Sequence, residues 1–114
     1  MMKTTIYKIV PQDLWAQAEK SGIFEGAAVD IADGYIHFST GEQVRETAAK
    51  HFAGQTDLLL VSVDAEKLGD KLLYEVSRGG ALFPHLYAAL PMDAVTKVEP
   101  LTLDANGLHI FPEL

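Results

Sequence analysis

Alternating apolar and polar positions predict a strand followed by a helix at the start of the chain. Residues 5–10 mix β-branched and aromatic side chains, a composition typical of a strand. Pro11 can open a helix, because its missing N–H would have no partner there, and Gly22 stands where a helix end is expected. Trp15 lies at helical spacing with its apolar neighbours, so we expect it to be a core residue.

The next segment has weaker periodicity. Residues 22–33 contain two glycines and no clear apolar stripe, and they predict a loop. The Asp33-Gly34 turn signal leads into a short strand at 35–38. In an extended strand, side chains two positions apart share a face, so Tyr35 and His37 should point to the same side.

A helix start follows this strand directly. Ser39 and Thr40 can both cap a helix, and Glu42 or Gln43 can complete a capping box three residues later. We therefore expect a helix over about 41–52.

Strand patterns dominate the second half of the chain. One short helical turn is expected at 65–68, and Asn106-Gly107 is a strong hairpin signal. Residues 82–90 are ambiguous, because Pro84 argues against a central strand. The other expected strands are 57–64, 72–76, 96–103 and 108–111.

Two helices in the first half and strands afterwards do not give the regular alternation of a doubly wound sheet. The order predicts an α+β fold. A chain of 114 residues has the length of one domain, so we treat residues 1–114 as a single domain.

Composition excludes several classes of protein. Zero cysteines rule out disulfides, a thiolate metal site and a cysteine nucleophile, and a formal charge of −7 argues against nucleic acid as a partner. No apolar run approaches the roughly 20 residues of a membrane span, and no signal peptide is apparent. We expect a cytoplasmic protein with no membrane partner. The chain also lacks the spacings of a metal site, a serine nucleophile elbow, a dinucleotide fingerprint and a P-loop.

One candidate site lies in residues 33–40, where a strand ends at a helix start. His37 can donate to a ribose hydroxyl or a phosphate, or move a proton, and the N–H groups of a helix start suit anions. Alternatively, His37 is a half-buried strand residue and Ser39 only a cap.

A second candidate lies in residues 78–90. A Gly-Gly pair precedes Phe83, His85 and Tyr87, a mixture of aromatic surface and a titratable ring that suits a small-molecule pocket. The alternative is a loop with buried aromatic residues and an exposed His85. Glu75, on the preceding strand, is expected to be a surface cross-strand partner.

Four segments together resemble a known family. The sequences IYKIV, YIHFST, LLLVSVD and FPHLYAAL, in this order, are similar to the small bacterial and plant family called domain of unknown function 952. The resemblance covers nearly the whole chain. That family in turn resembles the ADP-ribosyltransferase fold, and this implies a split β-sheet with two short helices in the N-terminal half and a cleft that holds NAD in the enzymes.

The resemblance also implies site residues. In diphtheria-toxin-like enzymes a strand histidine meets the nicotinamide-side ribose and a Ser or Thr follows two residues later, as in His37-Phe38-Ser39. By this analogy, His37 and His85 are the candidate catalytic residues. The late strand that carries a glutamate in those enzymes offers His85 here. The candidate NAD contacts are Tyr35, His37, Ser39, Thr40 and Tyr87.

Three hypotheses follow. The first is an NAD-binding or NAD-consuming, ADP-ribosyltransferase-like protein that needs no metal. The second is a nucleotide-binding module that kept the cleft and lost the glutamate. The third is another enzyme that uses His37 and His85 as an acid–base pair on a different small molecule. Because the protein is acidic and has few arginines, the phosphates of a dinucleotide would have to be received by N–H groups at 39–41.

Overall fold

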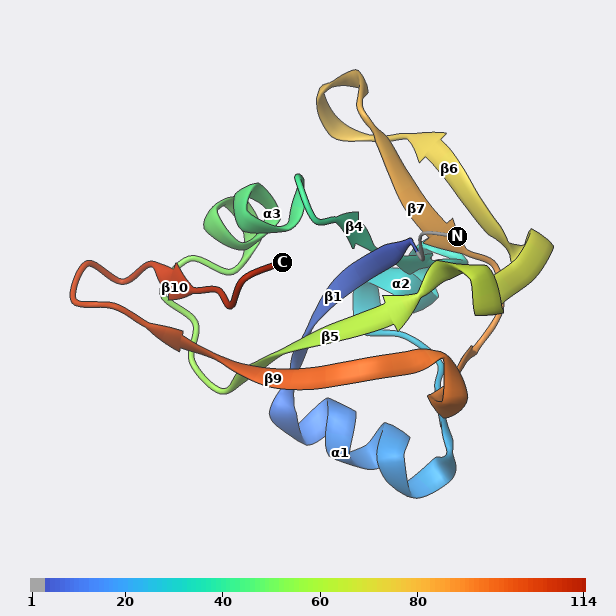
Figure 1. Cartoon of the computed structure of the whole chain (residues 1–114), viewed down its shortest axis with the longest axis horizontal. Helices are drawn as coiled ribbons and strands as arrows, with labels where there is room; N and C mark the ends of the chain where they lie inside the picture. Colours follow the sequence, from blue (N-terminus) through green and yellow to red (C-terminus); the bar gives the residue numbers. More distant parts are fainter. Residues whose placement is uncertain (1–3) are drawn as a thin grey trace.

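The longest strands form a curled antiparallel sheet in the computed structural model, which describes residues 4–114 (Figure 1). The sheet has five strands in the order β10-β9-β5-β1-β4, and β5 pairs with β1 along the whole length of both. The strands are β1 (Thr5–Pro11), β4 (Ser39–Thr40), β5 (Leu58–Asp64), β9 (Val95–Leu103) and β10 (His109–Ile110).

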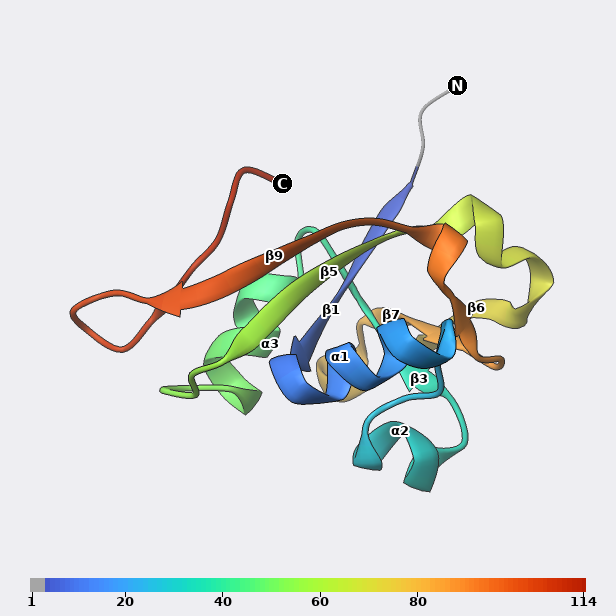
Figure 2. The same cartoon turned by 90° about the horizontal axis from the view of Figure 1, so that it is seen from below.

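Apolar residues alternate along β1 and β5, so each face of the sheet carries its own core. Helix α1 (Gln12–Ser21) brings Trp15 to one core, and α3 (Val44–His51) brings Val44 to the other. Figure 1 shows α1 and α3 on opposite sides of β5 and β9, and Figure 2 shows α2 (Ala28–Asp33) beyond α1, away from β9. Trp15 is 2% exposed, which confirms that it is a core residue.

A second, smaller sheet projects from the first as a hairpin with a short third strand (Figure 1). Its order is β3-β7-β6, with β3 at Ile36–His37, β6 at Leu72–Val76 and β7 at Leu82–Leu86. We call it the histidine sheet. Two short strands, β2 (Ile23–Phe24) and β8 (Leu90–Pro91), form a separate pair. Short 3-10 segments lie at Ala65–Lys71, where Gly69 interrupts the helix, and at Arg78–Gly80 and Met92–Ala94.

Most predicted elements are confirmed. The strand at 5–10 and the helix to Ser21 are present, and the helix ends at Gly22 in the left-handed conformation, with φ of 89°. The strands at 57–64, 72–76 and 96–103 are β5, β6 and β9. The Asn106-Gly107 turn connects β9 to β10, although β10 is shorter than predicted.

The prediction of a loop at 22–33 is wrong. The segment contains β2 and a helix, α2 (Ala28–Asp33), which ends at Gly34 with φ of 86°. No apolar stripe marks this helix, because its apolar residues Val29 and Ile31 are 56% and 67% exposed while Asp30 is buried. A polar contact holds the first turn instead: Asp30 accepts the N–H of Ala27 at 2.7 Å.

The helix predicted at 41–52 begins later, at Val44. Ser39 and Thr40 form β4, which pairs with β1, and the strand predicted at 35–38 shrinks to β3. The side-chain oxygen of Gln43 already accepts the Thr40 N–H at 3.0 Å. The N–H groups at 39–41 are therefore not those of a helix start, and the anion site predicted there is wrong.

Residues 82–86 are a strand in the middle of the histidine sheet, against the expectation from Pro84. The N and the carbonyl of a strand residue point to the same side, and the Pro84 carbonyl accepts the Phe38 N–H at 2.9 Å. Strand β3 has ended at that position, so the missing proline N–H removes no ladder bond. No helix within residues 4–114 is long and apolar enough to cross a membrane.

Candidate functional site

Two histidines from the two candidate segments lie directly opposite each other in the histidine sheet. His37 on β3 pairs with His85 on β7, and their ring centroids are 5.4 Å apart. Tyr35 stacks on His85 at 4.2 Å and lies 5.1 Å from Tyr87. We call Tyr35, His37, His85 and Tyr87 the aromatic cluster. The structure thus brings together four of the residues that the sequence singled out.

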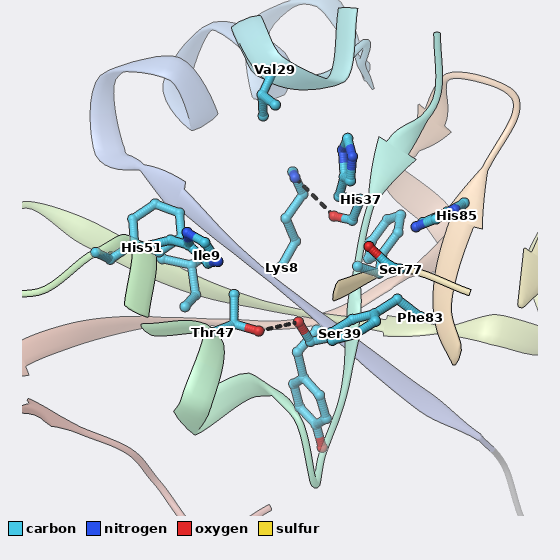
Figure 3. Close-up of a pocket in the computed structure, with 13 residues that line it drawn as sticks. Lys8, Ile9, Val29, His37, Ser39, Thr47, His51, Ser77, Phe83 and His85 are labelled. Carbon is cyan, nitrogen blue, oxygen red and sulfur yellow. Dashed lines mark hydrogen bonds between the residues drawn. The ribbon is translucent and has the colours of Figure 1, made fainter. Parts of the chain in front are cut away.

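A cavity of about 330 Å³ lies beside this cluster (Figure 3). Figure 3 shows Lys8 extending from β1 toward His37 at one end of the cavity, while Ser39 and Thr47 contact each other at the other end of the cavity. Ligand pockets commonly combine apolar walls with a few convergent polar groups. Here the walls include Ile9, Val29, Phe38, Phe52 and Phe83, and the polar groups include Lys8, His37, Ser39, Thr47, Ser77 and His85.

The other predicted contact residues lie outside this lining. Tyr35 and Tyr87 line an adjacent hollow of about 340 Å³, so the aromatic cluster stands between the two cavities. Thr40 lines a separate hollow with Arg45. The structure therefore does not bring Thr40 to the cavity that holds His37 and His85.

Asp30 holds His37 in place. It is only 1% exposed, and its Oδ1 accepts both the His37 ring Nδ1–H at 2.7 Å and the His37 backbone N–H at 3.1 Å. Lys8 approaches Oδ2 at 3.0 Å and also donates to the His37 carbonyl at 2.9 Å. One buried carboxylate thus joins α2, β1 and β3 around the histidine.

The charges of the buried Asp30 and Lys8 side chains depend on each other. Burial alone would raise the pKa of Asp30, but the Lys8 ammonium and the N–H groups of Ala27 and His37 hold that pKa below its usual value. Burial lowers the pKa of Lys8, and Asp30 opposes that effect. The pair is therefore an ionic contact in which each partner needs the other.

The second nitrogen of His37 faces another carboxylate. Its Nε2 lies 3.0 Å from Oδ2 of Asp33, which is the last residue of α2 and has a side chain 46% exposed. Carboxylates on both sides fix the plane of the ring. Both nitrogens of His37 are therefore engaged, and Nε2 becomes available to a ligand when the half-exposed Asp33 side chain moves away.

His85 has a different environment. It is 3% exposed, so the expectation of an exposed His85 is wrong. Its Nδ1 lies 2.9 Å from Oε1 of Glu75, and the Tyr87 hydroxyl donates to the same oxygen at 2.7 Å. Its Nε2 is buried, and none of the groups that the structure describes bonds to it. Glu75 is thus a cross-strand partner, as predicted, but its partners belong to the aromatic cluster.

The contacts of Glu75 change its own acidity and that of Tyr87. The hydrogen bonds from Tyr87 and His85 lower the pKa of Glu75, and Glu75 raises the pKa of Tyr87 to about 12. Both shifts favour a charged Glu75 and a neutral Tyr87. The Glu75 carboxylate is therefore a charged acceptor for the hydrogen bonds from His85 and Tyr87.

Ser39 offers an acceptor to the cavity. Its hydroxyl lies 3.1 Å from that of Thr47, and the Thr47 hydroxyl donates to the Gln43 carbonyl. Because a hydroxyl has one proton, Ser39 must donate to Thr47, which leaves its own lone pairs available.

Sequence reasoning missed Lys8, Asp30 and Asp33 as parts of the site. A signal for Lys8 was present, since it lies between Ile6 and Val10 on the inward side of a buried strand. Asp30 gave no comparable signal, because its segment has no apolar stripe and its partner Lys8 lies 22 positions away in the sequence. The described part of the chain, residues 4–114, contains no group of three or more His, Asp or Glu side chains that could hold a metal ion.

Comparisons with known proteins bear on the fold. A family model described as "Protein of unknown function (DUF952)" matches residues 9–98. The crystal structure of Protein CC0527 from Caulobacter crescentus is 54% identical, with 94% of each chain covered and a TM-score of 0.90. The solution NMR structure of CC0527 is 55% identical and covers 91% of this chain and 90% of that one, with a TM-score of 0.83. No curated protein matches the chain.

Proposed function

Because this chain belongs to the family described as "Protein of unknown function (DUF952)", a description that names no ligand, we propose a function from the site itself: the cavity beside His37 and His85 binds an NAD- or ADP-ribose-like nucleotide. One observation carries the proposal. The ring centroids of His37 and His85 lie 5.4 Å apart, beside a cavity of about 330 Å³ with aromatic walls. That combination of apolar surface and convergent polar groups is typical of a small-molecule site.

The size of the cavity indicates which part of the nucleotide enters. Ligand pockets span roughly 300–1,000 Å³, so about 330 Å³ suits the terminal ribose or the nicotinamide–ribose end rather than a whole dinucleotide. The rings of Phe38 and Phe83 offer surface to a planar group, and Ser39 and His85 offer polar atoms to hydroxyls. Phosphates would remain nearer the mouth of the cavity.

The resemblance to ADP-ribosyltransferases supports this ligand. His37-Phe38-Ser39 places His37 and Ser39 in the lining of one cavity, as the analogy requires. A carboxylate is also near, because Glu75 contacts His85 at 2.9 Å although it comes from β6. A fixed negative charge stabilises positive charge that develops on a ribose. Glu75 therefore favours a transferase-like reaction over a module that has lost its glutamate.

Calorimetric titration with NAD and ADP-ribose tests the proposal. We expect saturable binding by the wild-type chain and binding weakened by about tenfold or more in His37→Ala and His85→Ala, because each variant removes a ring that lines the cavity together with its hydrogen-bonding nitrogen. His109→Ala is the matched control, since His109 lies on β10 and is not part of the cavity lining. Folded wild-type protein that binds neither compound at millimolar concentration would contradict the proposal.

Release of nicotinamide separates catalysis from binding. A transferase-like protein liberates nicotinamide from NAD during long incubation, and Glu75→Gln should reduce that release. A binding module gives thermal stabilisation by NAD without any release.

One specific arrangement favours a second candidate, an acid–base enzyme acting on another small molecule. Each histidine contacts a carboxylate through Nδ1, His37 with Asp30 and His85 with Glu75. Two imidazoles at this separation can give and take protons on one substrate once the half-exposed Asp33 releases Nε2 of His37. A reaction that survives loss of either histidine would exclude this candidate.

A further inference from the structure

The contacts of His85 define what kind of ligand group the cavity selects. We infer that Glu75 is a positioning residue that keeps the His85 proton on Nδ1, so that Nε2 accepts a hydrogen bond from an O–H or N–H group of the ligand. The inference rests on the proposed function and deepens it, because it names a donor group, such as a ribose hydroxyl, as the feature recognised.

The geometry of the Glu75 carboxylate fixes the proton. A carboxylate accepts and cannot donate, and its Oε1 lies 2.9 Å from Nδ1 of His85, so Nδ1 is the nitrogen that carries hydrogen. The Tyr87 hydroxyl donates to the same oxygen at 2.7 Å and holds the carboxylate in that position. In the neutral ring the other nitrogen, Nε2, then has a lone pair and no hydrogen.

That lone pair has no partner in the part of the chain that the structure describes. Nε2 is buried, and no protein group bonds to it. Native proteins leave few buried polar atoms without a hydrogen bond, and those that remain are common at functional sites. His85 also lies in the lining of the cavity, where a bound donor would complete its hydrogen bonding.

Among the described residues, the one carboxylate in direct contact with the His85 ring is that of Glu75. The rings packed against His85 are Tyr35 on one face, at 4.2 Å, and His37 edge-on, at 5.4 Å. Glu75 contacts the Nδ1 side of the ring, whereas Asp30 bonds to His37 instead. The two nitrogens of His85 thus differ, because Nδ1 has a carboxylate partner and Nε2 has none among the described groups.

A ligand reaches Nε2 only if a neighbouring side chain shifts. Tyr35 stacks on the ring and follows Gly34, and Phe83 lies two residues before His85 on the same face of β7; both are partly exposed. Hydrogen bonds of functional histidines are often incomplete before a ligand binds. A shift of Tyr35 or Phe83 would therefore give a ligand donor access to Nε2 of His85.

Long-range proton–nitrogen NMR spectra of the ¹⁵N-labelled full chain test the first part of the inference, the position of the hydrogen on His85, because they report which ring nitrogen carries hydrogen. We expect the Nδ1–H form for His85 in the wild type, its retention in Glu75→Gln, whose amide oxygen still accepts, and its loss in Glu75→Ala. His109 is an internal control with the opposite pattern, since its Nε2 donates to the Gln55 carbonyl at 2.9 Å. An Nε2–H form of His85 in the wild type overturns the inference.

ADP-ribose is the probe for the second part of the inference, the hydrogen bond from a ligand group to Nε2 of His85. We expect the Nε2 signal of His85 to shift on titration, and Glu75→Ala to weaken binding by about tenfold while Glu75→Gln binds nearly as well as wild type. Equal affinity of the wild type and Glu75→Ala overturns the inference. A wild-type chain that does not bind ADP-ribose contradicts the proposed function, whereas the hydrogen position on His85 is read in the free protein and tests the inference separately.

Discussion

The two main sheets are stabilised in different ways. The five-stranded sheet has long strands, and its central residues Leu60, Val61 and Val63 are fully buried. The histidine sheet has strands of two to five residues, and several of its apolar side chains, such as Leu73 and Val76, are 46% and 70% exposed. The five-stranded sheet is held mainly by apolar burial, whereas the histidine sheet buries fewer apolar residues, such as Ile36 and Leu86, and adds polar contacts.

The difference shows how a site can be added to a stable framework. Apolar burial has no preferred direction, so it tolerates small shifts but cannot orient an imidazole. Hydrogen bonds from carboxylates do orient one, and Asp30 and Glu75 each hold a histidine of the histidine sheet. We therefore expect mutations in the two sheets to have different consequences for stability and for the site.

Asp30→Ala should have the largest effect. It leaves the buried Lys8 without its counter-charge and removes the partner of the His37 ring, so we expect a loss of about 3–5 kcal/mol in the free energy of unfolding. Urea denaturation measures the loss. Asp33→Ala is the matched control, because Asp33 contacts the same ring from a half-exposed position and should cost less than about 1 kcal/mol. Equal losses in the two variants would contradict the role given to Asp30.

Leu60→Ala tests the five-stranded sheet. Leu60 is 0% exposed, and its truncation leaves a cavity, so we expect a loss of about 2–4 kcal/mol. The hydrogen positions on His37 and His85, read by NMR, should not change. Leu73→Ala, at an exposed site of the histidine sheet, should stay within about 0.5 kcal/mol of wild type. Altered histidine signals in folded Leu60→Ala would show that the two sheets are not independent.

Tyr87→Phe should have the smallest effect, on acidity rather than on folding. The Tyr87 hydrogen bond is the main cause that lowers the pKa of Glu75, so the variant should move that pKa back toward 4.5. Carbon NMR of the Glu75 carboxyl during a pH titration measures the change. Tyr74→Phe is the control, since Tyr74 lies on the same hairpin and its hydroxyl has no hydrogen bond to Glu75.

The same pKa shifts predict how stability depends on pH. A carboxyl whose pKa is lowered in the folded state contributes stability above its unfolded pKa and loses that contribution as the pH falls through the folded value. The ordinary values are 4.5 for Glu75 and 3.8 for Asp30, and both are lowered here. The wild type should therefore lose stability as the pH falls below about 4.5, with a shallower decline in Tyr87→Phe. Thermal unfolding between pH 3 and 6, at roughly half-unit steps, would show this difference.

The sequence predicted the apolar framework better than the site. Burial repeats locally along β1, α1 and β5, so their residues reveal their own positions. Helix α2 has no such repeat, because its inward residue is Asp30 and its apolar residues face solvent. His37 and His85 could be singled out by their types and neighbours. Their carboxylate partners could not, because only tertiary folding brings Asp30 and Glu75 to them.

The most direct test of the proposed site is an NMR titration of the ¹⁵N-histidine-labelled chain with ADP-ribose. We predict saturable shifts of the ring signals of His37 and His85, which line the cavity, and no shift of His109, which does not. Unchanged signals of His37 and His85 at millimolar ADP-ribose, in protein that remains folded, would contradict this prediction. Shifts confined to His109 would place any binding at another surface.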